Sequence, residues 1–75
     1  MNVIEIDPEK MSGTPVFKGT RVPIRTMFDY LVDGTYDLQD FLEDFPTVDP
    51  NDAKELLLKA KQVFTSPEEI NRLQA

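Results

Sequence analysis

The amino-acid sequence predicts a mostly α-helical domain of the tri-helical helix-turn-helix (homeodomain-like) type, with a short N-terminal β-arm or small sheet. A run rich in Gly, Pro and β-branched residues occupies the first part of the chain, and from Ile24 onward apolar residues recur at i, i+3, i+4 and i+7. Helix-starting and helix-ending residues then divide the remainder into helices with short turns between them. At 75 residues the sequence predicts one domain, 1–75, made of a β-arm (1–23), a three-helix core (24–64) and a short C-terminal helix (66–75).

The β-arm is indicated by short runs of β-branched and aromatic residues. Val3-Ile4-Glu5-Ile6 is closed by Asp7-Pro8 and predicts a first strand. Pro15-Val16-Phe17 and Arg21-Val22 predict the two arms of a second element, with Lys18-Gly19-Thr20 as its turn. Each Pro favours extended geometry for the residue before it, and Gly permits turns that other residues resist.

Two helices follow, and each is marked by one apolar face. The first begins at Ile24 and is ended by Gly34, and its apolar face comprises Ile24, Met27, Phe28 and Leu31. The second has Asp37 as its N-cap and is stopped by Pro46. Its apolar face comprises Leu38, Phe41, Leu42 and Phe45.

The third helix has the clearest start signal, with Asp49 as N-cap and Pro50 at the first helical position. Leu58 falls outside its predicted core face, which comprises Ala53, Leu56, Leu57, Ala60, Val63 and Phe64. Ser66-Pro67-Glu68-Glu69 matches a capping box and predicts a last helix whose apolar residues are only Ile70 and Leu73. We expect that helix to be marginal or to depend on a partner.

Composition argues against an enzyme and against a membrane protein. The chain has no cysteine and no histidine, which excludes thiolate chemistry, imidazole metal ligands and a histidine general base. Asp40 and Asp44 are spaced to share a divalent cation, but such pairs are more typical of a solvated acidic helix. No apolar run approaches the ~20 residues that span a bilayer, and no signal peptide is recognised. We therefore expect a cytoplasmic, non-enzymatic protein without cofactor or metal.

Charge is distributed unevenly along the chain, whose net charge is -6. Residues 10–28 carry four cations and no acid, whereas residues 29–55 carry nine acids against Lys54 alone, a net charge of -8. One interpretation is that the helices are acidic only for solubility. The other is that the chain offers a basic patch to one partner and an acidic face to another.

Nucleic-acid contacts are predicted at two places. In a helix-turn-helix the N-terminal residues of the second helix of the pair enter the major groove, and here these include Asn51 and Lys54. Asp52 and Glu55 lie beside them and repel phosphates, so basic residues of the β-arm and the first helix are the better phosphate contacts. The predicted nucleic-acid-binding residues are Lys18, Arg21, Arg25, Asn51 and Lys54.

One sequence motif resembles a known family. The run G-T-P-V-F-K-G-T-R-V-P-I at 13–24, followed by Tyr30-Leu31, Gly34 and F-L-E-D-F-P-T-V at 41–48, resembles the bacterial and archaeal domain-of-unknown-function family 433, over roughly residues 4–64. The resemblance implies a small helix-turn-helix protein with an N-terminal β-arm, often homodimeric. It also implies a VapB-like antitoxin that is paired with a PIN-like ribonuclease toxin.

The leading functional expectation is therefore an antitoxin-like protein that binds and neutralises a PIN-like ribonuclease and, as a homodimer, binds its own promoter DNA. Arg72, the only cation of the last helix, is predicted to enter the carboxylate-lined metal site of the nuclease. The alternative for Arg72 is a surface pair with Glu68 or Glu69.

Two other functions stay open. One is a stand-alone transcriptional regulator of helix-turn-helix type. The other is a homodimeric protein-interaction module that does not bind DNA, in which Leu58 and the β-arm lie between protomers. The predicted partner-binding residues are Leu58 and Arg72.

Overall fold

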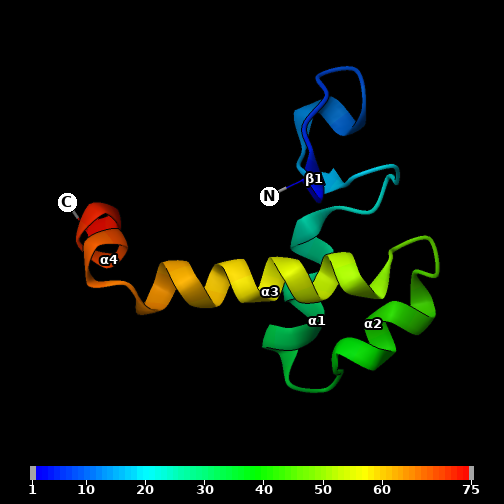
Figure 1. Cartoon of the computed structure of the whole chain (residues 1–75). Coiled ribbons are helices and arrows are strands. Elements are labelled where there is room, and N and C mark those ends of the chain that lie inside the picture. The colour runs from blue at the N-terminus through cyan, green and yellow to red at the C-terminus, as the bar shows by residue number, and fades with distance from the viewer. Residues whose placement is uncertain (1, 75) are drawn as a thin grey trace.

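The structure is a computed structural model and describes residues 2–74. Its elements, in chain order, are β1 (Ile4–Glu5), the 3-10 turn η1 (Met11–Gly13), β2 (Val16–Phe17), α1 (Ile24–Asp33), α2 (Leu38–Asp44), α3 (Pro50–Thr65) and α4 (Pro67–Gln74). Figure 1 shows the helices making up most of the chain and the strands lying near its N-terminus. The predicted fold class, mostly helical with a small sheet, is confirmed.

The two strands pair within the chain. β1 runs antiparallel to β2, with Ile4 opposite Phe17 and Glu5 opposite Val16. After β2 the backbone turns at Gly19, which has a φ of 78°, in the left-handed region that favours glycine. The Thr20 N–H donates to the Phe17 carbonyl at 3.0 Å and closes the predicted turn.

A left-handed turn between the strands was not predicted. Met11, Ser12 and Gly13 all have positive φ, at 55°, 55° and 82°. The Gly13 N–H donates to the carbonyls of Asp7 and Lys10, each at 3.2 Å, and holds the turn against the end of β1. No sequence pattern marks this turn, because Met and Ser seldom adopt left-handed geometry.

The predicted helix ends are confirmed by their capping groups. α1 ends at Gly34, which is left-handed with a φ of 79°. Asp37 and Asp40 form a capping box at α2, each carboxylate accepting the other residue's backbone N–H at 2.9 Å. The Asp49 carboxylate accepts the Asn51 N–H at 2.8 Å at the start of α3.

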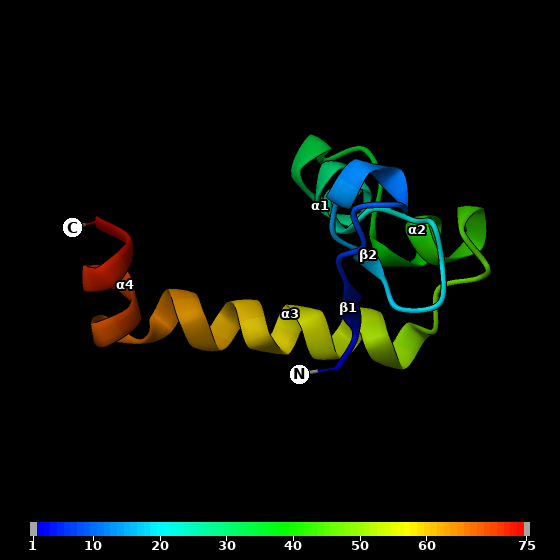
Figure 2. The ribbon, with the colours of Figure 1, turned by 90° about the horizontal axis from the view of Figure 1, so that it is seen from above.

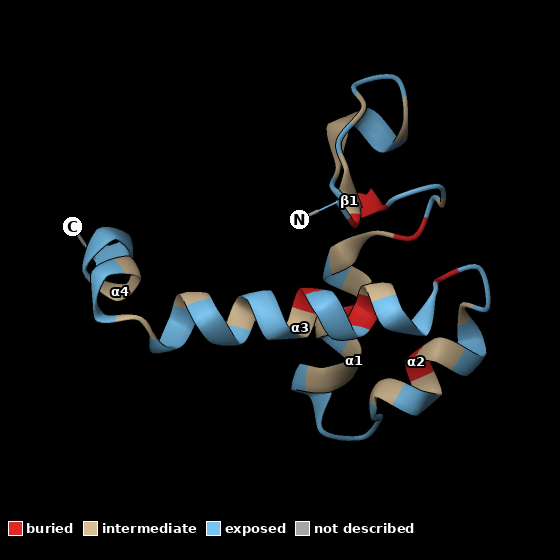
Figure 3. Cartoon of the chain, in the orientation of Figure 1, coloured by how far each residue is buried: buried red, intermediate tan, exposed pale blue. Residues whose placement is uncertain are grey.

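The hydrophobic core lies where α1, α2 and α3 meet the sheet. Met27, Phe41 and Ala53, one from each helix, are completely buried. The other buried members of this cluster are Val3, Phe17, Val22, Val48 and Leu56. In Figure 3 the buried stretches gather at this junction, while the C-terminal half of α3 and the whole of the described α4 are mostly exposed.

α3 extends beyond the elements that it covers. Along α3 the core and the residues packed against it reach no further than Leu57. Phe64 is 64% exposed, and Ala60 and Val63 are not among the residues that pack on the core, so the prediction that these three belong to it is wrong. Figures 1 and 2 both show this part of α3 running away from the other helices to α4, which packs against the end of α3. We call residues 58–74 the C-terminal arm.

Within residues 2–74, no helix combines the length and the apolar composition that crossing a membrane requires.

Candidate functional site

The five predicted nucleic-acid-binding residues are all exposed. Lys18 and Arg21 flank the turn after β2, and Arg25 lies in the first turn of α1. Asn51 and Lys54 lie near the start of α3.

The side chains of Lys18, Arg21 and Arg25 do not share one site. Arg21 lines a shallow hollow with Lys10, Thr20 and Thr47, whereas Arg25 lines a different, mostly apolar hollow beside Ile4. The Lys18 ammonium donates to the Asn2 side-chain oxygen at 3.2 Å. These cations therefore form a spread basic surface and not a pocket for one anion.

The start of α3 carries acids among the residues predicted to read bases. Asp49 caps the helix and Asp52 lies in its first turn. Glu55 is exposed one residue after Lys54. Negative charge here disfavours close approach to phosphates, so this helix depends on cations elsewhere for any affinity for DNA.

Glu5 supports the turn that presents the basic residues, and the sequence had not singled it out. Its carboxylate accepts the Gly19 N–H and a bond from the Lys10 ammonium, each at 3.3 Å. These two hydrogen bonds hold the pKa of Glu5 below its usual value, and the bond from the Gly19 N–H has the larger effect, followed by the bond from Lys10. The carboxylate thereby ties β1 to the tip of the turn.

An acidic and aromatic hollow between α1 and α2 was also missed. It is lined by Asp29, Tyr30, Asp33, Tyr36 and Asp44. The Tyr30 hydroxyl donates to an Asp44 carboxylate oxygen at 2.7 Å, and this bond is the main cause that raises the pKa of Tyr30 to about 12. The two tyrosine rings lie 5.3 Å apart between centroids. No periodic signal links residues on two helices in this way.

Asp40 and Asp44, the two carboxylates spaced to share a cation, have separate structural partners. Asp40 accepts the Asp37 N–H in the capping box, and Asp44 accepts the Tyr30 hydroxyl.

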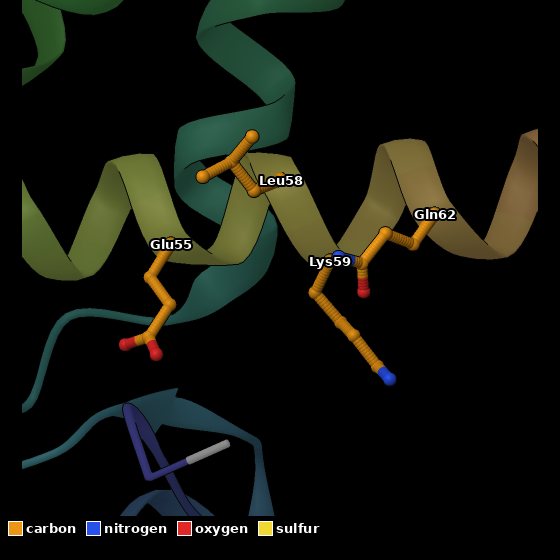
Figure 4. A pocket seen from close by; sticks show the side chains of 4 residues that line it. All are labelled: Glu55, Leu58, Lys59 and Gln62. Atoms are coloured by element: carbon orange, nitrogen blue, oxygen red, sulfur yellow. The ribbon is translucent and has the colours of Figure 1, made fainter.

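The C-terminal arm carries both predicted partner-binding residues. Leu58 is 52% exposed and lines a shallow hollow on α3 with Glu55, Lys59 and Gln62 (Figure 4). The Arg72 guanidinium lies 3.3 Å from the Glu69 carboxylate, at helical spacing, and its side chain is 73% exposed. The surface pair considered for Arg72 is therefore present. Phe64 and Leu73 are exposed on the same arm.

Comparison with known proteins identifies the family. No curated protein and no solved structure is found to match the chain significantly. A family model described as "Protein of unknown function (DUF433)" matches residues 4–58, which is more than half of the chain. The match takes in the β-arm, α1, α2 and the first part of α3, and it ends where the C-terminal arm begins. The chain belongs to the DUF433 family of proteins of unknown function.

Proposed function

We propose that this protein is a non-enzymatic, antitoxin-like protein that binds and neutralises a PIN-like ribonuclease and, as a homodimer, binds its own promoter DNA. The observation that carries the proposal is the exposure of three large apolar side chains on the C-terminal arm. Leu58, Phe64 and Leu73 are 52%, 64% and 59% exposed, on a segment that adds nothing to the core. We infer that a partner covers these side chains, because the elements of the core do not reach them.

The class of partner comes from the family resemblance and is supported by charge. Residues 26–53 contain eight acids and no lysine or arginine. Three of these acids, Asp29, Asp33 and Asp44, surround the hollow between α1 and α2. A ribonuclease needs a basic surface to hold RNA, and opposite charges speed the association of two proteins and favour that partner over others.

Arg72 is the residue that we assign to the nuclease's metal site. Its only ion pair among the described residues is the exposed one with Glu69. An exposed pair of this kind contributes little to stability, so the guanidinium can leave Glu69 at small cost. A cluster of carboxylates offers it a stronger, bidentate contact.

The test is co-expression with a small ribonuclease encoded beside this gene, followed by co-purification and RNA cleavage assays. We expect Arg72→Ala to weaken inhibition by about tenfold, because a charge-assisted contact is lost. Lys61→Ala, which removes another exposed cation of the arm, is the matched control and should inhibit like the wild type. Full inhibition by Arg72→Ala refutes the role of Arg72. If a Phe64→Ser/Leu73→Ser variant also inhibits fully, the C-terminal arm is not the contact surface. If the wild type does not bind the ribonuclease, the proposed function is refuted.

DNA binding is supported by the exposure of Lys18 and Arg21 on the turn after β2. A gel-shift titration on the promoter should show affinity that falls steeply with salt. Lys18→Gln/Arg21→Gln should reduce the slope of log affinity against log salt by about 2, because each phosphate contact contributes ~0.9. Lys59→Gln is the control and should leave the slope unchanged. Absence of salt-sensitive association at low ionic strength would instead favour the pure protein-interaction module.

A further inference from the structure

The small sheet has one open edge. β2 is flanked on one side by β1 and on the other by the segment after the turn, where the Phe17 N–H donates to the Val22 carbonyl at 3.0 Å and Val16 is bridged to Pro23. Among the described residues, β1 has a neighbouring strand on one side only. The outer edge of β1 is therefore the place where another strand can add.

The hydrogen-bond pattern shows which groups lie on that edge. The Lys18 N–H donates to the Val3 carbonyl at 2.9 Å, so Val3 and Lys18 form a hydrogen-bonded pair. Such pairs alternate along an antiparallel ladder, and the next pair, Ile4 with Phe17, is therefore not hydrogen-bonded. The N–H and C=O of Ile4 point away from β2, and by the two-residue period those of Ile6 do too.

The side chains beside this edge are apolar, one exposed and one half-buried. Ile6 is 65% exposed. Ile4 lines a hollow whose other apolar members are Pro15, Ile24 and Phe28. Because Ile4 and Ile6 point to the same face, a strand added at this edge would cover both of them.

We propose that the outer edge of β1 pairs with the same edge of a second copy of this chain. In an antiparallel pairing about a two-fold axis at Glu5, Ile4 of each copy lies opposite Ile6 of the other copy. This pairing joins the two small sheets into one continuous sheet. The edge is complementary to itself, because each copy presents the same two donors and two acceptors. Residues 2–6 contain no lysine or proline, the residues that commonly protect an open edge from such pairing.

Charge is compatible with this register. The axis brings the Glu5 residues of the two copies together, and two bare carboxylates there would repel. Each Glu5 carboxylate, however, lies 3.3 Å from the Lys10 ammonium of its own chain. This ion pair within each copy offsets the repulsion between the two carboxylates. This inference rests on the homodimer of the proposed function and does not depend on the nuclease.

The first experiment measures dimer dissociation by analytical ultracentrifugation for wild type, Ile6→Lys and Val32→Lys. Val32 is 82% exposed on α1 and is a matched β-branched control away from the edge. We expect Ile6→Lys to raise the dissociation constant about tenfold or more, since it loses the apolar cross-strand contact with Ile4 and places a lysine on each side of the axis. Val32→Lys should leave the constant within about twofold. If Ile6→Lys and Val32→Lys change the dissociation constant equally, the inference about the β1 edge is wrong. If the wild type stays monomeric up to about 1 mM, the homodimer is wrong as well.

The second experiment uses the absence of native cysteine. The Glu5 positions of the two copies form a pair without hydrogen bonds, whose Cα atoms lie about 4.5 Å apart, within disulfide range. Mild oxidation should therefore link Glu5→Cys into a covalent dimer and leave Val32→Cys monomeric. If Leu58→Cys forms a covalent dimer and Glu5→Cys does not, the dimer interface lies on α3. That result would support the homodimer and refute pairing through the edge of β1.

Discussion

At the scale of single residues, Tyr30 connects two helices that the chain joins by a short loop. Its hydroxyl donates to Asp44 of α2, and its ring packs edge-on against Phe41, with centroids 5.5 Å apart. The same side chain therefore belongs to the core on one side and to the acidic hollow on the other. The hydroxyl must keep its proton to serve as this donor, which makes the contact sensitive to pH.

We predict that Tyr30→Phe lowers the free energy of unfolding and makes that free energy depend less on pH in the alkaline range. The folded pKa is raised to about 12 from an ordinary value of 10.0, so the stabilisation is fully present below pH 10 and is lost as pH rises from 10 to about 12. The free energy of unfolding, measured by urea titration across that range, should fall less steeply in the variant.

Tyr36→Phe is the control, because no hydrogen bond links the Tyr36 hydroxyl to a described residue. If wild type and Tyr30→Phe lose stability in parallel between pH 10 and 12, the Asp44 contact does not contribute.

At the scale of elements, α2 depends on its ends. It has only 7 residues, which is too short to be stable in isolation, and its first turn is held by the capping box of Asp37 and Asp40. Its one buried residue, Phe41, and the half-buried Leu38 and Leu42 attach it to the core. Loss of the cap should therefore weaken the docking of the whole helix.

We predict that Asp37→Ala lowers the free energy of unfolding by about 0.5–2 kcal/mol, the usual cost of removing an N-cap side chain. Asp37→Asn should retain most of the stability, since the amide oxygen can accept the same N–H bond. Chemical denaturation monitored by circular dichroism measures both. An Asn variant as unstable as the Ala variant would show that charge, and not capping, is what this residue supplies.

At the scale of the whole molecule, the chain divides into a core and a projecting arm. The core cluster and the residues packed on it end at Leu57, and no buried residue lies in α4. The family match ends at nearly the same place, residue 58. We therefore expect the core to hold together without the arm.

We predict that deleting residues 67–75 changes the free energy of unfolding by less than about 1 kcal/mol, because exposed segments contribute little. Phe41→Ala should cost about 3–5 kcal/mol, which is close to the entire stability of a domain this small. Urea titration of both proteins makes the comparison. A deletion as costly as Phe41→Ala would show that α4 is part of the stable fold.

The candidate surfaces were predictable only in part. The exposure of Lys18, Arg21 and Arg25 follows from their place in a turn and at a helix start, and their roles stay predictions. The contact between Tyr30 and Asp44 could not be predicted, because it joins side chains 14 positions apart on separate helices. Likewise, the free outer edge of β1 depends on which segments flank β2.

The sequence by itself determined where the helices begin and end and which family the chain resembles. Asp37, Gly34 and Pro50 act on backbone groups within one turn of themselves, so their effect is independent of distant residues. Only the tertiary structure decided how much of an apolar face is covered. Leu56 and Phe64 belong to the same predicted face of α3, yet one is buried and the other exposed. The reason is that burial depends on the length of the elements packed opposite a helix, and α1, α2 and the sheet end before α3 does.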